Sequence, residues 1–314
     1  MTVPLVSVCI PTVRPTTLGC AIASVLRQTS ADWELLVLGQ GDAVVLRSAV
    51  ERAAAGDPRV RYVHLRRAGL SAARNAALRH ARGELLAFTD DDCEARDDWL
   101  ATATQSLEDD PELGLVGGSL RGAPAPDGRR GPAVYLRIEP EEVRYDPRAT
   151  PPPAPPGFVW VGGNFVLRRA AAELIGPFDE LLGQGAPFRE GEDADYSLRA
   201  EAAGVPMLCT PRSVVVHTHG RRYGMRTMLR YWTGQGRGRG AIAAKLAMRG
   251  DSRAGDDLRL DLARVRARLA ERRPARVPAD AVRVVAAVGA YRHCIAHYRL
   301  DRYGVFVARP GAGG

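Results

Sequence analysis

Residues 84–99 have the sequence ELLAFTDDDCEARDDW, and this stretch decides the fold. The apolar run Leu85–Phe88 is short and bounded by polar residues, which is typical of a buried strand. Asp90, Asp91 and Asp92 (the acidic triplet) follow it, so we expect three carboxylates where a core strand leaves its sheet. Like charges this close repel one another unless a cation or a network of donors compensates.

Two interpretations of the acidic triplet fit this stretch. Hard divalent cations prefer carboxylate oxygens, and Mg²⁺ usually shares its site with substrate phosphates. The triplet can equally belong to a solvated loop that caps the next helix, with Asp97 or Asp98 at the N-cap. The triplet alone favours neither interpretation, so the rest of the chain has to decide.

Length and composition limit the number of domains and the class of protein. The chain has 314 residues, 46% of them hydrophobic, which is enough for one large α/β domain or two smaller ones. Its uncharged apolar runs fall short of the roughly 18 residues that indicate a membrane span. Residues 1–10 lack a basic region, so no signal peptide is predicted. The five cysteines are odd in number and lack metal-ligand spacing, which indicates reduced thiols in a cytoplasmic protein.

The net charge of +8 comes almost entirely from arginine, because Lys245 is the only lysine among the 44 basic residues. A skew of this kind can reflect coding bias. Positive charge suits nucleic acid, an anionic membrane surface or a phosphate-bearing substrate alike. The charge by itself therefore selects no partner.

Strands and helices alternate through the first 120 residues. Such alternation implies right-handed crossovers and a mostly parallel sheet, with ligands at the carboxyl ends of the strands. Thr12, Gln40 and the acidic triplet all fall at such ends. We expect strands at 6–10, 34–38, 59–65, 84–89 and from 115. Helices are expected from Thr16 or Thr17, after the 39–42 turn as far as Gly56, from Ser71 to Gly83, and over 99–108.

The second half of the chain is less regular. Residues 121–157 are rich in proline and glycine, which predicts a loop or spacer without strands. We then expect a strand over 158–168, a glycine loop over 183–191, a helix over 192–203 and a strand over 214–216 that presents His217 and His219. Beyond Arg221 the chain is predicted to be helical and rich in arginine. These boundaries suggest a catalytic domain over 1–220, with halves 1–120 and 121–220, and an extension over 221–314.

The turn after the first predicted strand argues against one common class of enzyme. A Rossmann dehydrogenase needs G-x-G-x-x-G there, and this chain has Pro11-Thr12-Val13-Arg14-Pro15 instead. The Gly39-Gln40-Gly41 turn follows the second strand and lacks a third glycine in register. A dinucleotide enzyme is therefore disfavoured.

Seven motifs occur in a characteristic order: IPT-x-R-P, SVLRQ, GLSAARNAAL, TDDD, GGN, FDE and GEDADYSLR. In order and spacing the chain resembles a family 2 glycosyltransferase from Val6 to about Gly240. The resemblance implies the GT-A fold, an α/β Rossmann-like fold with a mixed, mostly parallel sheet flanked by helices, here with a helical C-terminal extension. It also implies a metal-dependent, inverting transfer of a sugar from a nucleotide-diphosphate sugar to an acceptor nucleophile, of the hexosyltransferase type (EC 2.4).

The resemblance assigns a donor site. The acidic triplet matches the family's D-x-D motif: Asp92 would ligate Mg or Mn on the diphosphate, Asp90 would approach the ribose or the hydration shell of the metal, and Asp91 would lie on the nucleotide side. Arg74 matches an arginine beside the nucleotide, although alone it would be interpreted as a helix-surface residue. The first nucleotide-contacting turn is matched by Pro11, Thr12 and Arg14.

The resemblance also assigns the chemistry. Glu192 and Asp193 match the pair that supplies the general base, and Asp193 is our preferred base; the alternative is an acidic first turn stabilised by the helix dipole. His217 or His219 would lie near the metal, with His217 preferred, although a histidine after a strand can also be structural. Gln40 stands where the family commonly has an acid that recognises the base. Its side chain offers a donor and an acceptor, so the nucleotide stays open.

The remaining expectations concern partners. The acceptor would be a glycan, a lipid-linked intermediate or a small natural product, and no nucleic acid is expected. The arginine-rich tail, which includes the run over 234–240, fits a diphosphate-closing segment, an anionic acceptor or inner membrane surface, or a basic helix pair. Predicted helices over 258–269 and 282–298 would dock on the domain or form a homodimer.

Two rival functions fit parts of the pattern. A nucleotidyltransferase on a related sheet would show a glycine-rich signature after its first strand, which this chain lacks. A basic RNA- or membrane-associated binding protein would carry an inert acidic cluster. Metal-dependent hydrolysis of a sugar nucleotide would distinguish that protein from both enzymes.

Overall fold

The computed structural model describes residues 5–123, 137–149, 162–218, 224–270 and 277–311. The chain divides into two compact units. The first unit comprises Met1–Ala68, Ala72–Pro177 and Tyr196–Arg221, and the second comprises Gly69–Ser71, Phe178–Asp195 and Arg222–Gly314. Residues 178–195 thus group with the C-terminal helices, although the sequence alone assigned them to the 121–220 half.

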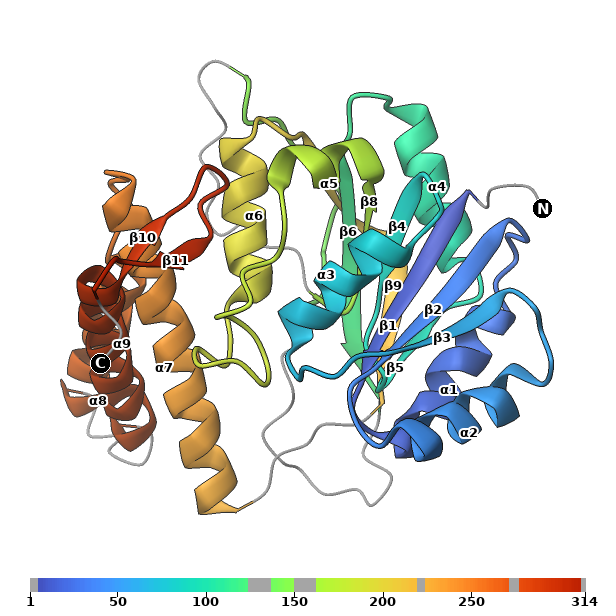
Figure 1. Cartoon of the computed structure of the whole chain (residues 1–314). Helices are drawn as coiled ribbons and strands as arrows, with labels where there is room; N and C mark the ends of the chain where they lie inside the picture. Colours follow the sequence, from blue (N-terminus) through green and yellow to red (C-terminus); the bar gives the residue numbers. More distant parts are fainter. Residues whose placement is uncertain (1–4, 124–136, 150–161, 219–223, 271–276, 312–314) are drawn as a thin grey trace. The chain divides into compact units, whose positions relative to one another are not determined.

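The first unit is built on a mixed sheet flanked by helices (Figure 1). Pairing is parallel between β1 and β2, β2 and β3, β1 and β4, and β6 and β9, while β8, β5 and β7 pair antiparallel to their neighbours. The fold class predicted from the sequence is confirmed. The strands, in sheet order, are β3 (Val60–His64), β2 (Trp33–Gly39), β1 (Val6–Thr12), β4 (Leu85–Phe88), β8 (Phe165–Arg168), β6 (Leu115–Gly122), β9 (Met207–His217) and β5 (Cys93–Ala95), with β7 (Val143–Tyr145) beside β9.

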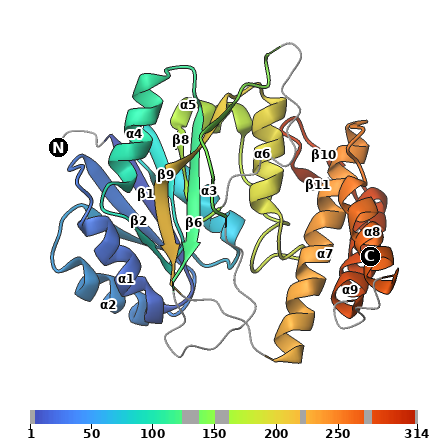
Figure 2. The same cartoon turned by 180° about the vertical axis from the view of Figure 1, so that it is seen from behind.

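One face of this sheet carries the main apolar core. The helices α1 (Pro15–Leu26) and α4 (Trp99–Asp109) contribute their buried sides to it, together with the alternate residues of β1 and β2 that point to that face. Figure 2 shows both helices in front of the sheet. The first unit also contains α2 (Ala43–Ala54), which packs on α1, most of α3 (Leu70–His80), α5 (Arg169–Ile175) and, from Tyr196 on, α6 (Glu192–Ala202).

The register of the sheet brings the predicted loops to one edge. Cys9 of β1 pairs with Phe88, the last residue of β4, while Thr12 pairs with Gly39 at the end of β2. The turn after β1 therefore lies beside the residues that follow Phe88. Those residues are the acidic triplet.

Two predicted helix starts differ from the structure. The α1 helix begins at Pro15 with Arg14 at the N-cap, so the predicted caps Thr16 and Thr17 are wrong. Proline favours the first helical position because its φ is preset and it lacks an N–H there. The α3 helix includes Ser71, whose hydroxyl donates to Leu182 O at 2.7 Å instead of capping. Asp98 does occupy the N-cap of α4, but its carboxylate accepts from Arg96.

Five elements were not predicted, and the pairing of β5 and of β7 with β9 is non-local. The β5 strand is only three residues long, too short for a recognisable alternation, and it forms by pairing with β9. The β7 strand contradicts the expectation that all of 121–157 is loop; residues 124–136 and 150–161 lie outside the described residues. The helix α5 and the hairpin of β10 (Tyr298–Leu300) and β11 (Phe306–Ala308) were also missed. The β9 strand is longer than predicted and includes Pro211 where its register with β6 shifts.

The second unit contains the long helices α7 (Met225–Met248), α8 (Asp256–Ala270) and α9 (Val277–His297). The glycine run of 234–240 lies inside α7. A Cβ at Gly236 or Gly240 would collide with backbone atoms of α9, and one at Gly238 would lie 2.5 Å from Glu190 O. The glycine run therefore allows α9 and the segment around Glu190 to pack closely against two sides of α7. Of the interpretations above, the structure favours helix packing.

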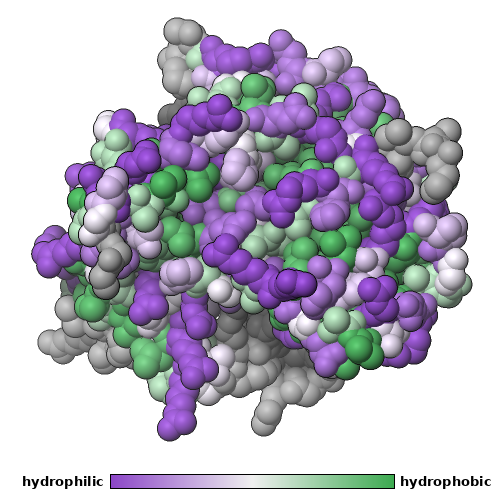
Figure 3. Space-filling model, in the orientation of Figure 1, coloured by the Kyte–Doolittle hydropathy of each residue, from purple (hydrophilic) through white to green (hydrophobic). Residues whose placement is uncertain are grey.

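Hydrophilic side chains cover much of the face seen in Figure 3, with small apolar patches between them. The most exposed large apolar side chains of the second unit belong to Met225 and Val285. No helix among the described residues is long and apolar enough to cross a membrane.

Candidate active site

The acidic triplet is compensated by the turn that follows β1. Thr12 Oγ1 donates to Asp91 Oδ2 at 2.7 Å. Arg14 Nη2 donates to Asp91 Oδ1 at 2.8 Å and to Asp92 Oδ2 at 3.1 Å. Burial would lower the pKa of Arg14, but its bonds to Asp91 and the two nearby charges raise it. The turn therefore supplies the donor network that adjacent carboxylates require.

The three aspartates of the triplet have different surroundings. Asp91 is buried and accepts a bond on each carboxylate oxygen, so its main contacts are with the protein. Asp92 is also buried and lies between Arg14 and His217. Asp90 is the most exposed of the three. A contact between Asp91 and the nucleotide stays a prediction.

Arg74 is buried beside Asp90, so the alternative of a helix-surface arginine is wrong. Its Nη2 donates to Gly162 O at 2.9 Å and lies 3.9 Å from Asp90 Oδ1. A Cβ at Gly163 would lie 2.8 Å from Asp90 Oδ2, and one at Gly162 would lie 2.5 Å from Arg74 Nη2. The two glycines of the GGN motif thus make room for the arginine and the aspartate.

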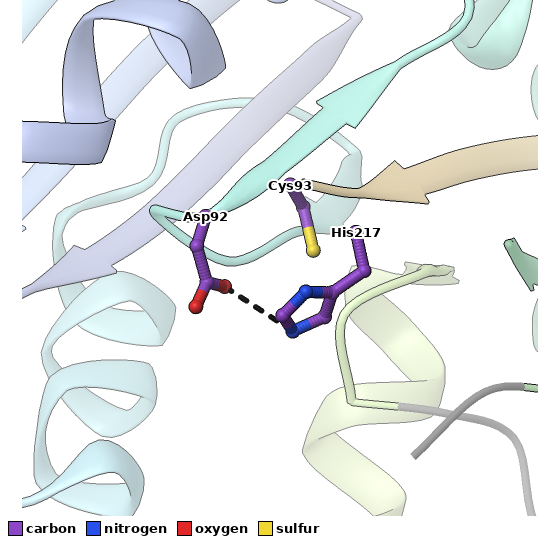
Figure 4. A group of neighbouring side chains, drawn as sticks. All are labelled: Asp92, Cys93 and His217. Atoms are coloured by element: carbon purple, nitrogen blue, oxygen red, sulfur yellow. Dashed lines mark ion pairs between the residues drawn. The ribbon is translucent and has the colours of Figure 1, made fainter. Parts of the chain in front are cut away.

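His217 belongs to β9, which is separated from β4 by β8 and β6 in the sheet. It ends β9 and pairs with Cys93 of β5, which places its Nε2 3.5 Å from Asp92 Oδ1 (Figure 4). Asp92 is fixed in turn by Thr218, whose N and Oγ1 donate to Asp92 O at 2.9 and 3.1 Å. The structure therefore brings His217 to the acidic triplet, whereas His219 lies outside the described residues.

These side chains fit a divalent cation. Ligand atoms of Asp92, Cys93 and His217 lie within 4.8 Å of one another. Burial, with Asp90 and Asp92 nearby, raises the pKa of the Cys93 thiol well above its usual value. A thiol binds metals as the thiolate, so Cys93 is a poor ligand here. The carboxylate and imidazole that remain, with phosphate oxygens of a substrate, suit Mn²⁺ or Mg²⁺ better than a soft metal.

Two residues of the predicted nucleotide site have local structural contacts. Gln40 Nε2 donates to Arg67 O at 2.9 Å and Gln40 N donates to Thr12 O at 2.9 Å, so this residue connects the turns after β1, β2 and β3. Pro11 is buried within β1. Recognition of the base by Gln40 stays a prediction.

The predicted catalytic pair lies in the second unit, where the helix α6 (Glu192–Ala202) begins. Glu192 is buried, and its carboxyl carbon would lie 3.2 Å from a Cβ at Gly183, whose φ is +93°. Asp193 is more exposed and accepts from Ala194 N at 2.8 Å. Three acids in the first turn of α6 are favourable near the helix N-terminus.

Two motif residues form structural hydrogen bonds within the fold. Asn164 of GGN is fully buried: its Nδ2 donates to Ser119 O at 2.9 Å and to Ser213 O at 3.1 Å, while its Oδ1 accepts from Trp99 Nε1 at 2.8 Å. Gln28 of SVLRQ donates to Arg96 O at 2.8 Å. Both residues fix the strands and loops around the acidic triplet.

Sequence reasoning missed a group in the second unit. Lys245 is buried in α7 and contacts Asp179 of the FDE motif and Asp195 of α6. The rarity of lysine in this chain was the available signal. The same unit has a largely apolar groove of about 680 Å³, lined by Pro187, Phe188, Thr233, Arg237, Ala281, Val282, Val285, Ala286, Gly289, Ala290 and His293.

The fold and the site define a class: an α/β protein that presents an acidic triplet, two arginines and a histidine at one sheet edge. Residues 7–176 match the sequence profile of Glycosyl transferase family 2, which covers more than half of the chain. The chain belongs to this family.

Individual relatives agree with that assignment. An uncharacterized glycosyltransferase of Bacillus subtilis (strain 168), EpsJ, is 30% identical over 211 residues, 66% of this chain and 59% of the relative. The Escherichia coli enzyme WfgD, a UDP-Glc:alpha-D-GlcNAc-diphosphoundecaprenol beta-1,3-glucosyltransferase, is 37% identical over 99 residues, 31% of this chain and 37% of the relative. The matched part of the chain thus spans less than two thirds of either relative.

A solved structure supports the fold. The mannosyltransferase PcManGT of Pyrobaculum calidifontis, determined with GDP-Man and Mn²⁺, superposes with a TM-score of 0.56 at 21% identity. The alignment covers 91% of this chain and 76% of that one. The fold is therefore the GT-A fold, as the motif order implied.

Proposed function

We propose that this protein is a metal-dependent, inverting glycosyltransferase that moves a sugar, of the hexosyl type, from a nucleotide-diphosphate sugar to an acceptor nucleophile. The observation that carries the proposal is the 3.5 Å approach of His217 to Asp92, beside two arginines and at the carboxyl ends of β1 and β4. Ligands of open α/β sheets bind at such ends.

The donor side of the proposed site rests on four residues. Asp92 and His217 would hold Mg or Mn, which when bound neutralises charge on the diphosphate leaving group. Arg14 is half-exposed and bonded to Asp91 and Asp92, so its guanidinium can turn from these carboxylates toward a phosphate of the donor. Arg74 holds Asp90 in place for the ribose or for the hydration shell of the metal.

The choice of nucleotide remains part of the proposal. One similar protein is named for UDP-glucose and another was solved with GDP-mannose, so similarity alone supports no single base. Gln40 follows β2 and lies partly exposed beside the β1 turn, which favours it as the residue that recognises the base.

The catalytic step assigned to the second unit is a proton transfer. Asp193 accepts the proton of the acceptor hydroxyl while that oxygen attacks the anomeric carbon and the bond to the nucleotide diphosphate breaks. Glu192 supports the same turn from its buried position. The family resemblance, rather than the geometry, supports inversion.

The acceptor, the assembly and the location stay proposals. A glycan, a lipid-linked intermediate or a small natural product would each provide the hydroxyl. A cytoplasmic protein in peripheral contact with the inner membrane face, and a homodimer formed through the C-terminal helices, agree with the arginine-rich extension. We keep 1–220 as the proposed catalytic domain and 221–314 as its extension.

The deciding experiment is calorimetric titration of the protein with UDP-, GDP- and dTDP-sugars with and without Mn²⁺. One of these donors should bind at least tenfold more tightly with Mn²⁺, and Asp92→Ala should remove that gain. Asp97→Ala is the matched control, because Asp97 is an exposed acid five residues further along the chain. Equal affinity with and without Mn²⁺ in the wild type would contradict the proposal.

A further inference from the structure

The only lysine of the chain occupies a buried position that joins two carboxylates. Lys245 Nζ lies 2.6 Å from Asp179 Oδ2 and 2.7 Å from Asp195 Oδ1, and all three side chains are buried. The three residues belong to the second unit. In a chain with so many arginines, this position stands out because it is occupied by the other basic side chain.

The surroundings explain why an ammonium group fits this position. It is compact, with three donors in tetrahedral directions, whereas a guanidinium is planar and larger. Two of the donors meet carboxylates from different elements, and the ammonium also lies 4.7 Å from the centre of the Phe306 ring. A buried site this closely surrounded leaves little room for an arginine.

Each carboxylate of this cluster is fixed to a different part of the unit. Asp179 accepts from Leu181 N at 3.0 Å and from Phe306 N at 2.8 Å, which ties the FDE turn to β11. Asp195 belongs to the first turn of α6, and its N donates to Gly191 O at 2.9 Å. Lys245 therefore connects the start of α6 to α7, to the FDE turn and to the hairpin.

The geometry of a helix links this connection to Asp193. Residues two positions apart on an α-helix point about 200° apart around the axis. Since Asp195 points inward to Lys245, Asp193 is directed to the opposite side, in agreement with its greater exposure. The contact between Asp195 and Lys245 thus holds the first turn on the side opposite to Asp193.

We propose that Lys245 is a positioning residue that acts through Asp195 to hold the first turn of α6 in the orientation that the general base requires. This inference rests on the proposed function where it names Asp193 as the base. A lysine that only stabilises the fold would affect kcat no more than another buried ion pair of the same unit does.

The test compares variants of this cluster with a matched control in the same unit. Lys245→Met removes the charge, and Asp195→Asn keeps the size of the side chain while weakening the bond. Asp261→Asn is the control, because Asp261 is equally buried and accepts from Arg239 of α7 and from Arg264, away from α6. Should Lys245→Met fail to fold, Asp195→Asn carries the test.

Two readouts are expected. Both cluster variants should lower kcat at least tenfold with the donor affinity unchanged, and their effects should not add to that of Asp193→Asn. Amide hydrogen exchange over 191–195 should be at least tenfold faster in both variants than in the wild type. Asp261→Asn should change neither quantity, whatever its effect on unfolding. Lys245→Arg keeps the charge and should still lower kcat.

The outcomes separate this inference from the proposed function. Unchanged exchange over 191–195 in Asp195→Asn, or an equal loss of kcat in Asp261→Asn, would overturn the positioning role. A fully active Lys245→Arg would overturn the requirement for a compact ammonium. If Asp193→Asn is itself fully active, the proposed base is wrong, while the exchange measurement still reports on the Lys245 contact.

Discussion

Two acidic clusters of this protein look alike in sequence and differ in how their charge is compensated. The acidic triplet of the first unit is paired with Arg14, whose side chain is 50% exposed. The first turn of α6 in the second unit is tied through Asp195 to Lys245, which is 4% exposed. An exposed partner can be replaced by a ligand at little cost, whereas removing a buried partner leaves an uncompensated charge. The comparison teaches that the accessibility of the counter-charge separates a binding cluster from a fixed one.

The largest expected effect concerns Asp193, the more exposed acid in the first turn of α6. Asp193→Asn keeps the size of the side chain and removes the proton acceptor, so kcat should fall by roughly a hundredfold or more, the usual scale for lost general-base help. Donor affinity should stay unchanged because the proposed donor contacts belong to the acidic triplet. The measurement pairs the transfer rate with the donor affinity of the same preparation. A loss of affinity in proportion to rate would make Asp193 a binding residue, and unimpaired transfer would place the base elsewhere.

A smaller effect should follow when the exposed partner is removed. Arg14→Ala leaves Asp91 and Asp92 to repel each other, and we expect a loss of about 1 kcal/mol in unfolding free energy after allowing for solvent screening. Mn²⁺ should restore more stability in this variant than it adds to the wild type, because the cation takes over the compensation. Urea unfolding with and without Mn²⁺ provides the measurement.

The control for Arg14 is an arginine paired with an acid in the other unit. Arg239 of α7 pairs with Asp261 and is 32% exposed. Arg239→Ala should lose stability that Mn²⁺ does not restore. Equal responses of the two variants to Mn²⁺ would show that the acidic triplet is no more open to a cation than any other acid.

A several-fold effect is expected at Gln40. Gln40→Ala should weaken the nucleoside diphosphate by about threefold to tenfold, as for the loss of one or two hydrogen bonds of about 1 kcal/mol. Pyrophosphate with Mn²⁺ should bind as before, because it has no base. Calorimetric titration of both ligands measures the difference. If both ligands weaken alike, Gln40 acts only by connecting the turns after β1, β2 and β3.

The smallest effect should come from salt. Raising the ionic strength from about 0.1 to about 1 M shortens the screening length from about 10 to about 3 Å, which weakens exposed ion pairs more than buried ones. Amide exchange around Arg14 should therefore accelerate slightly, by about twofold or less, while exchange over 191–195 stays constant. Acceleration at both places would mean that the Lys245 cluster is as open to solvent as the acidic triplet.

Much of the candidate site around the acidic triplet was predictable from the sequence because its signals are local. A short apolar run that ends in three aspartates indicates a strand end wherever it occurs, and parallel strands bring their carboxyl ends to one edge. Thr12, Arg14 and the acidic triplet meet there as expected. The motif order gave the family and the fold, which the comparisons confirm.

Other features depended on contacts between distant residues. The strand β5 exists because residues 93–95 meet β9, and that pairing brings His217 beside Asp92. The burial of Arg74 against Gly162 and the hydrogen bonds of Asn164 depend on packing between distant residues, which no local pattern encodes. Periodicity reports which face of an element is apolar, but it does not report the partner of that face.

Lys245 shows most clearly how local sequence signals differ from contacts between distant residues. The sequence shows one lysine beside 43 arginines, together with the motifs FDE and GEDAD that contain its partners. It does not show that residues 179, 195 and 245 meet, because side chains so far apart along the chain come together through the packing of α6, the FDE turn and α7. The identity of a residue limits the bonds it can form, and the fold decides which of those bonds exist.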